Sequence, residues 1–128
     1  MISVDVFKQA NYPVSSPKLK KRLRDFFRKE GIVSDAEVSV AVVGEKKMLE
    51  LGRKYAKDKK LHQVLSFVPE EAKKGFIYPL DEKLHLGEII VCYPKVVEEA
   101  KAEGKLIEEK LNELVEHGAL HLLGKHHE

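Results

Sequence analysis

The sequence has a single cysteine, Cys92, and lacks the features that direct a chain out of the cytoplasm. A lone cysteine excludes an internal disulfide, and its position in the apolar run EIIVCY predicts a small buried hydrophobic residue. No stretch of about 18 apolar residues occurs, and the chain turns polar within its first ten residues, so we expect neither a membrane span nor an export leader. These absences predict a cytoplasmic protein.

Internal repeats, low-complexity tracts and dividing linkers are also absent from the sequence. Their absence argues against a solenoid and against a multidomain chain. A chain of 128 residues with 43% hydrophobic content is long enough to bury one core. The sequence therefore predicts a single domain over residues 1–128.

The formal net charge of +2 conceals an uneven distribution along the chain. Residues 1–64 hold 15 Lys and Arg against 8 Asp and Glu, whereas residues 65–128 hold 8 against 13. A basic half of this kind favours a polyanionic partner such as nucleic acid. A solvated Lys/Glu-rich surface, common in thermophilic proteins, accounts for the same composition, so charge alone leaves both interpretations open.

Hydrophobic periodicity predicts a mixed order of helices and strands. Ser16 is placed to cap a first helix, with Pro17 at the first helical position, and Gly31 is expected to end it. The nearly continuous apolar run 86–93 predicts an interior strand. The other expected strands are 2–7, 38–43 and 62–68, and the other expected helices are 45–57, 94–104 and 105–123. This order predicts an α+β fold, with a mixed sheet of about four strands packed by four or five helices.

The histidines are concentrated at the C-terminus, where four of the six lie within the last twelve residues. His117 and His121 are four residues apart, so a helix places both imidazoles on one face, close enough to bind one ion at ~2.0–2.1 Å. Gly124 is expected to break the helix, so that the chain turns back and presents His127. Three neutral imidazoles leave a fourth tetrahedral position open, which is typical of a catalytic zinc site. His126 is the neighbouring alternative, but the offset of ten residues from His117 favours His127.

The same spacing occurs in the metzincin proteases, with one difference. Those enzymes have a Glu directly after the first histidine as the general base, and this chain has Gly118 there. Peptidase activity of that kind is therefore disfavoured.

Three blocks of the sequence resemble the YbeY family of metal-dependent endoribonucleases. The block HGALHLLG, followed by His127, is similar to the family signature H-G-x-L-H-L-x-G-x-D-H. Val64-Leu65-Ser66-Phe67 matches the family's V-L-S-F, and residues 86–91 resemble its L-G-D-I-x-I strand. The resemblance implies a zinc-dependent endoribonuclease of single-stranded RNA, with one Zn²⁺ per chain. It also implies a role in rRNA maturation and ribosome quality control, in association with the small ribosomal subunit.

The sequence departs from the family pattern at a position that concerns catalysis. The family usually has Tyr-Arg about ten residues before V-L-S-F, and this chain has Tyr55-Ala56. Arg53 and Lys57 are the nearest candidates to replace the absent cation, although each also fits an ordinary exposed helix charge. The missing arginine favours a second hypothesis, a catalytically weak metal-binding factor of RNA or ribosome assembly. A metal hydrolase with another substrate is a third.

The remaining candidate residues follow from what such an enzyme requires. Ser66 is a candidate to position the substrate, or else a strand residue that fills space. Glu88 is a candidate to orient a metal-binding histidine, or else an edge charge. The RNA-binding surface is expected around Lys54 and Lys57, because a basic segment attracts the phosphate backbone of RNA in a sequence-tolerant manner. No signature of a known RNA-binding module supports this surface.

Overall fold

A four-stranded sheet forms the centre of the protein in the computed structural model, which describes residues 1–68 and 84–126, with side chains up to Gly124. The strands are β1 (Ile2–Lys8), β2 (Ala36–Val43), β3 (Val64–Phe67) and β4 (Leu84–Cys92). Their order across the sheet is β1-β2-β4-β3. β1, β2 and β4 are parallel, whereas β3 pairs antiparallel with β4. The predicted mixed sheet is therefore confirmed, and so is the interior position of β4.

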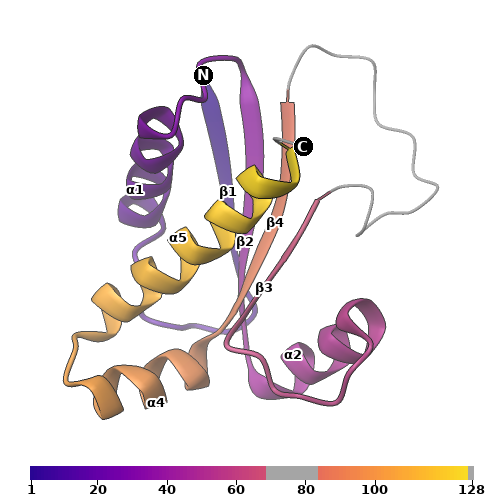
Figure 1. Ribbon diagram of the computed structural model, residues 1–128. Coiled ribbons are helices and arrows are strands. Elements are labelled where there is room, and N and C mark those ends of the chain that lie inside the picture. Colours follow the sequence, from indigo (N-terminus) through magenta and orange to yellow (C-terminus); the bar gives the residue numbers. More distant parts are fainter. Residues whose placement is uncertain (69–83, 127–128) are drawn as a thin grey trace.

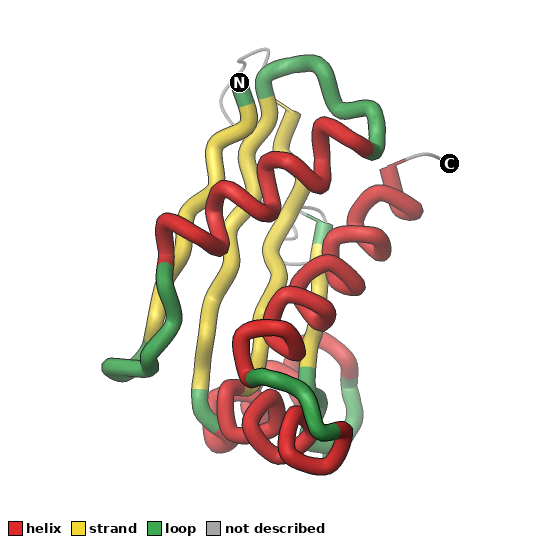
Figure 2. The backbone as a smooth tube through the Cα atoms, turned by 90° about the vertical axis from the view of Figure 1, so that its left-hand side faces the viewer, coloured by secondary structure: helices red, strands yellow, loops and turns green. Residues whose placement is uncertain are grey.

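Four α-helices accompany the sheet in the described residues, as the α+β prediction requires. They are α1 (Ser16–Lys29), α2 (Glu45–Leu51), α4 (Tyr93–Glu103) and α5 (Ile107–His126). Figure 1 shows α5 crossing the sheet diagonally, with its C-terminal end near the start of β4. Figure 2 shows the strands as one layer, with α5 running along it. Among the described helices, none is long and apolar enough to cross a membrane.

Helix α1 begins one residue earlier than predicted. Ser15 is the N-cap residue: its backbone is extended, and its side-chain oxygen accepts a hydrogen bond from the Lys18 N–H at 3.4 Å. The prediction of Ser16 as the cap is therefore wrong. Two adjacent serines before Pro17 satisfy the capping rule equally, so the local sequence does not distinguish them.

The predicted helix 45–57 is an α-helix only in its first half. After Leu51 the chain continues as the π-helical segment η1 (Gly52–Ala56), and Lys57 then ends it with a positive φ of 55°. A Cβ atom on Gly52 would lie 3.3 Å from the ring of His62 and 3.4 Å from a carbonyl oxygen. The glycine therefore lets the following loop return close to the helix, which a regular α-helix pattern does not predict.

The sheet carries a separate hydrophobic core on each face. The core against α1 and α5 contains Val38, Val40, Val42, Ile89 and Val91. The core against α2 contains Met48, Phe67, Ile90 and Cys92, so the predicted burial of Cys92 is confirmed. Because side chains alternate along a strand, the register assigns each strand residue to the α5 face or the α2 face.

One irregularity in β4 lies at Gly87. The pairing with β2 shifts between Glu37 and Val38, so β4 has an extra residue at this point. Gly87 has a φ of +134°, and a Cβ atom there would lie 2.1 Å from the carbonyl oxygen of Phe67. Only glycine fits, because both the conformation and the close approach of β3 exclude a side chain.

Helix α5 does not end where the sequence predicted. It continues through Gly124 to His126, so the expected break at Gly124 is wrong. Leu122 and Leu123 are buried beneath this last turn. Their burial outweighs the roughly 1 kcal/mol that glycine costs inside a helix. His127 lies outside the described residues.

Candidate metal centre

The predicted pair of metal-binding histidines lies on the exposed side of α5. The Nε2 atoms of His117 and His121 are 3.1 Å apart, and their ring centroids are separated by 4.6 Å. Two nitrogens bound to one tetrahedral ion at ~2.0–2.1 Å would lie about 3.3–3.4 Å apart. The two nitrogens already have nearly this separation, so the pair fits two ligands of a single transition metal. Within the described residues no cluster of three such ligands is found, and the predicted third ligand, His127, lies outside them.

The histidines border a cavity of about 700 Å³ between α5 and β3. Ser66 also lines this cavity, and its partner across the sheet is Ile89, which faces α5. The register therefore puts Ser66 on the same face as the histidines. The structure thus brings together three of the predicted site residues, His117, His121 and Ser66, from segments about fifty residues apart in the chain.

Gly118 sets the distance between α5 and the sheet. A Cβ atom on this residue would lie 2.9 Å from Cγ2 of Ile89 and 3.4 Å from Cγ2 of Val64. The Cβ position therefore points at the sheet, although the glycine itself also borders the cavity. A glutamate here would clash with the core, which gives a physical reason why the metzincin arrangement is excluded.

The cavity is acidic toward the N-terminal half of α5. Lys110, only 5% exposed, also lines it and contacts Glu103 at 2.9 Å, Glu113 at 3.4 Å and Glu99 at 3.6 Å. The hydrogen bond to Glu103 raises the pKa of Lys110, and the same contact lowers the pKa of Glu103. Lys105 also contacts two of these carboxylates, Glu113 at 2.6 Å and Glu103 at 3.3 Å, so three carboxylates meet two cations. This end therefore keeps a small excess of negative charge, which disfavours a phosphate there.

Similarity to known proteins identifies the family of the chain. The family model for endoribonuclease YbeY matches residues 6–128. The chain belongs to the YbeY endoribonuclease family. The resemblance carried by the three sequence blocks is therefore confirmed.

Individual relatives extend over most of the chain. A YbeY endoribonuclease of Acinetobacter baumannii is 32% identical over 125 residues, covering 95% of this chain and 76% of the relative. One of Dehalococcoides mccartyi is 36% identical over 123 residues, covering 90% and 77%. The solution structure of TM1509 from Thermotoga maritima has a TM-score of 0.62 and 29% identity, over 93% of this chain and 71% of that protein.

The candidate replacements for the YbeY arginine lie away from the cavity lining. Arg53, Lys54 and Lys57 are exposed on and directly after η1, whose Tyr55 packs on Phe67 in the core of the α2 face. None of the three cations is among the described residues that line the cavity beside His117. A basic surface at Lys54 and Lys57 therefore exists, but across the edge strand β3 from the histidine pair.

Glu88 is also separated from the histidines. Its partners are Ser39 on β2 and Phe67 on β3, and Phe67 belongs to the core against α2. The side chain of Glu88 therefore lies on the face of the sheet that is turned away from α5. This placement does not bring its carboxylate next to His117 or His121.

The sequence reasoning missed two features beside the YbeY site. One is the buried Lys110 with its three glutamates, and the other is an ion pair between Arg22 of α1 and Glu116 of α5, with Nε and Oε2 2.7 Å apart. Lys110 could have been predicted to lie on the same side of the helix as His117, because the two are seven residues, or about two helical turns, apart. The ion pair joins residues 94 positions apart, and no local pattern predicts such a contact.

Proposed function

We propose that this chain is a zinc-dependent endoribonuclease that cleaves single-stranded RNA and acts in rRNA maturation and ribosome quality control at the small ribosomal subunit. The observation that carries the proposal is the 3.1 Å separation of the two Nε2 atoms in a member of an endoribonuclease family. Both imidazoles are exposed and neither belongs to a hydrophobic core, so the pair is accessible to an ion; without one, the same 3.1 Å contact is a hydrogen bond between the two rings.

The chain's own residues would bind the ion and orient the RNA. His117 and His121 would bind through neutral Nε2 atoms, with His127 as the third ligand. Zinc, when bound, would act as a Lewis acid toward a phosphoryl oxygen and would lower the pKa of a water molecule. The Ser66 hydroxyl, on the facing strand, would donate a hydrogen bond to the RNA. Because Glu113 and Glu116 line the cavity toward the start of α5, the phosphate would approach from the β3 side or over the later turns of α5.

The metal is tested first, by elemental analysis of protein never exposed to chelator. We expect close to one equivalent of a transition metal. His117→Ala and His121→Ala should each abolish binding, because each removes one of three protein ligands. His85→Gln is the control, since His85 lies on β4 beside its register partner Glu37 of β2, on the face of the sheet that is turned away from α5. Protein without metal would refute the proposal, and loss of metal from His126→Ala but not His127→Ala would refute the choice of third ligand.

Catalysis is tested with a labelled single-stranded RNA and either zinc or manganese. Wild-type protein should cleave it internally, and the His117 and His121 variants should not. Lys54→Glu with Lys57→Glu should weaken RNA binding across sequences and reduce its salt dependence, since each lysine is exposed. Unchanged affinity at low salt would show that these two lysines are ordinary surface charges.

The alternative, a catalytically weak assembly factor, is favoured by one observation. Ala56 stands where the YbeY pattern has arginine, and neither Arg53 nor Lys57 is among the described residues lining the cavity. A missing charge donor typically costs ~10²–10³ in rate. Ala56→Arg should therefore raise cleavage at least about tenfold, which corresponds to ~1.4 kcal/mol. If neither protein cleaves RNA while both bind metal and RNA, the assembly-factor function replaces the nuclease.

A further inference from the structure

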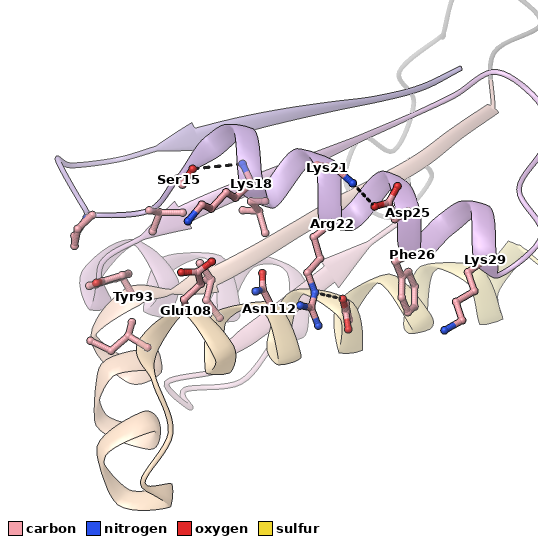
Figure 3. Close-up of a pocket in the computed structure, with 16 residues that line it drawn as sticks. Ser15, Lys18, Lys21, Arg22, Asp25, Phe26, Lys29, Tyr93, Glu108 and Asn112 are labelled. Atoms are coloured by element: carbon pink, nitrogen blue, oxygen red, sulfur yellow. Dashed lines mark hydrogen bonds and ion pairs between the residues drawn. The ribbon is translucent and has the colours of Figure 1, made fainter.

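A second groove lies between α1 and α5, on the other side of α5 from the histidine cavity. It has a volume of about 780 Å³. Figure 3 shows Arg22, Phe26 and Lys29 pointing from α1 toward α5. Its floor is apolar and includes Val14, Leu19 and Leu111. A groove of this size with a few converging polar groups is typical of a binding site.

One wall of this groove is strongly basic. Helix α1 has seven Lys or Arg between Ser16 and Lys29 and one acidic residue, Asp25. Four of these cations line the groove: Lys18, Lys21, Arg22 and Lys29. Among the described side chains, Lys18 and Lys29 have no ion-pair partner, so their charge is available to a ligand.

The two ends of the groove have different linings. One end contains Tyr93, Lys18 and Glu108, near the start of α5 (Figure 3). The other end contains Phe26 and Lys29, beside the later turns of α5 (Figure 3). Phe26 is half-buried, so part of its ring is open to the groove. A cation next to an open aromatic ring suits a nucleotide, because the phosphate pairs with the cation and the base stacks on the ring.

The groove and the histidine cavity meet at Glu116, which lines both of them and precedes His117 in the chain. Arg22 contacts the carboxylate of Glu116 through Nε at 2.7 Å, and its side chain is 55% exposed. This cation therefore lies where the two sites join and can contact a phosphate as well. Leu120 lies one turn further along α5 and is 49% exposed. A ligand that extended from the groove to the histidine cavity would therefore pass an uncharged side chain at this point of α5.

We propose that the end of the α1–α5 groove formed by Arg22, Phe26 and Lys29 binds the flanking segment of a single-stranded RNA whose scissile phosphate lies at the histidine pair. The inference rests on the proposed function for the identity of the cleaved strand. A helix with its side chains is about 10–12 Å wide. The groove therefore contacts the strand a few nucleotides away from the cleaved bond.

The inference is tested by fluorescence anisotropy with a labelled 2′-O-methyl oligouridine 12-mer, whose intactness is checked on a gel. The groove variant is Arg22→Gln with Lys29→Gln. The matched control is Lys20→Gln with Arg24→Gln, on the same helix but outside the groove lining, with the same loss of two charges. If two phosphate contacts are lost, the slope of log affinity against log salt changes by about 1.4, and affinity falls about 25-fold at 0.1 M salt.

Length and stacking provide two further measurements. A trinucleotide is too short to occupy both sites and can still bind at the histidine pair, so the groove variant should weaken its binding by a smaller factor than it weakens binding of the 12-mer. Phe26→Leu keeps an apolar side chain and should weaken binding of the 12-mer at least about fivefold through lost stacking. Far-UV circular dichroism of each variant checks that the fold is retained.

The outcomes separate this inference from the proposed function. Equal weakening by the groove variant and its control, or no binding of the 12-mer by wild type, overturns the groove as an RNA site. The nuclease proposal survives either result if wild type still cleaves RNA in a His117-dependent manner. If the groove variant alone loses binding while wild type cleaves no RNA, the groove stands and the nuclease proposal fails. Groove resonances that shift in ¹⁵N spectra with an oligoglutamate peptide and not with RNA assign the groove to an acidic protein partner and overturn the inference.

Discussion

The glycine pair of α5 offers a direct test of how closely this helix lies on the sheet. Gly118 and Gly124 belong to the same helix, and replacing either with alanine gains the same intrinsic helix propensity, about 1 kcal/mol in a helix interior. Their surroundings differ. A Cβ atom on Gly124 meets nothing within 4 Å, whereas one on Gly118 would lie 2.9 Å from Ile89, which is fully buried.

The expected stabilities follow from these contacts. Gly124→Ala should stabilise the protein by about 0.5–1 kcal/mol, somewhat reduced by fraying near the helix end. Gly118→Ala gains a similar amount but pays for overpacking, which typically costs 1–3 kcal/mol, because the β-branched Ile89 has little freedom to move. The two variants should therefore differ by about 1–3 kcal/mol, with Gly118→Ala the less stable.

Urea unfolding in EDTA, followed by circular dichroism, measures this difference without the added stability of a bound metal. A zinc titration then reports the functional consequence. If α5 is displaced from β3, the Gly118→Ala protein should bind zinc more weakly, and Gly124→Ala should bind it normally. A Gly118→Ala protein that is as stable as Gly124→Ala would refute the close packing, and with it the account of why glycine stands at this position.

Three other predictions concern stability. Lys110→Met should lower the free energy of unfolding in urea by about 1 kcal/mol, because it removes the hydrogen bonds that join α4 to α5. Lys95→Met removes a pair at the surface and should change stability by less than about 0.5 kcal/mol. Equal effects of the two substitutions would contradict the buried role of Lys110. Gly87→Ala should reduce the yield of folded protein or its melting temperature sharply, and a normal melting temperature would show that β3 does not approach this position. The third prediction concerns stability in acid. Four carboxylates have lowered pKa values because each accepts a side-chain hydrogen bond: Asp25 from Lys21, Asp58 from His62, Glu103 from Lys110 and Glu113 from Lys105. These carboxylates bind protons less readily when folded, so their stabilisation is present above about pH 4.3 and is lost as the pH falls through their folded pKa values; urea midpoints that do not decline below pH 4 would contradict this assignment.

The two basic surfaces lie on opposite sides of the histidine pair. The surface at Lys54 and Lys57 lies beyond the edge strand β3, and the α1 groove lies beyond α5. The glutamates around Lys110 would repel a phosphate that approached along the N-terminal half of α5. Binding data for variants of both surfaces would establish whether one strand contacts them together.

Much of the fold was predictable because the information is local. The alternation of Val38, Val40 and Val42 and the continuous run in β4 predicted two interior strands, since strand burial follows from a period of two. The errors also have local causes. Ser15 and Ser16 both satisfy the capping rule, and the weak helix preference of Gly124 is overridden by burial of Leu122 and Leu123, which depends on the sheet beneath them.

The sequence by itself determined two things about this protein: the spacing of His117 and His121 puts two imidazoles on one helix face, and the three sequence blocks carry the family. Both follow from residue identity and helical geometry alone. Only the tertiary structure decided what surrounds that pair. It brought Ser66 into the cavity, turned Glu88 to the other face of the sheet through the irregularity at Gly87, and joined Arg22 to Glu116. The physical reason is that strand register and helix packing depend on contacts between residues far apart in the chain, which no pattern of neighbouring residues specifies.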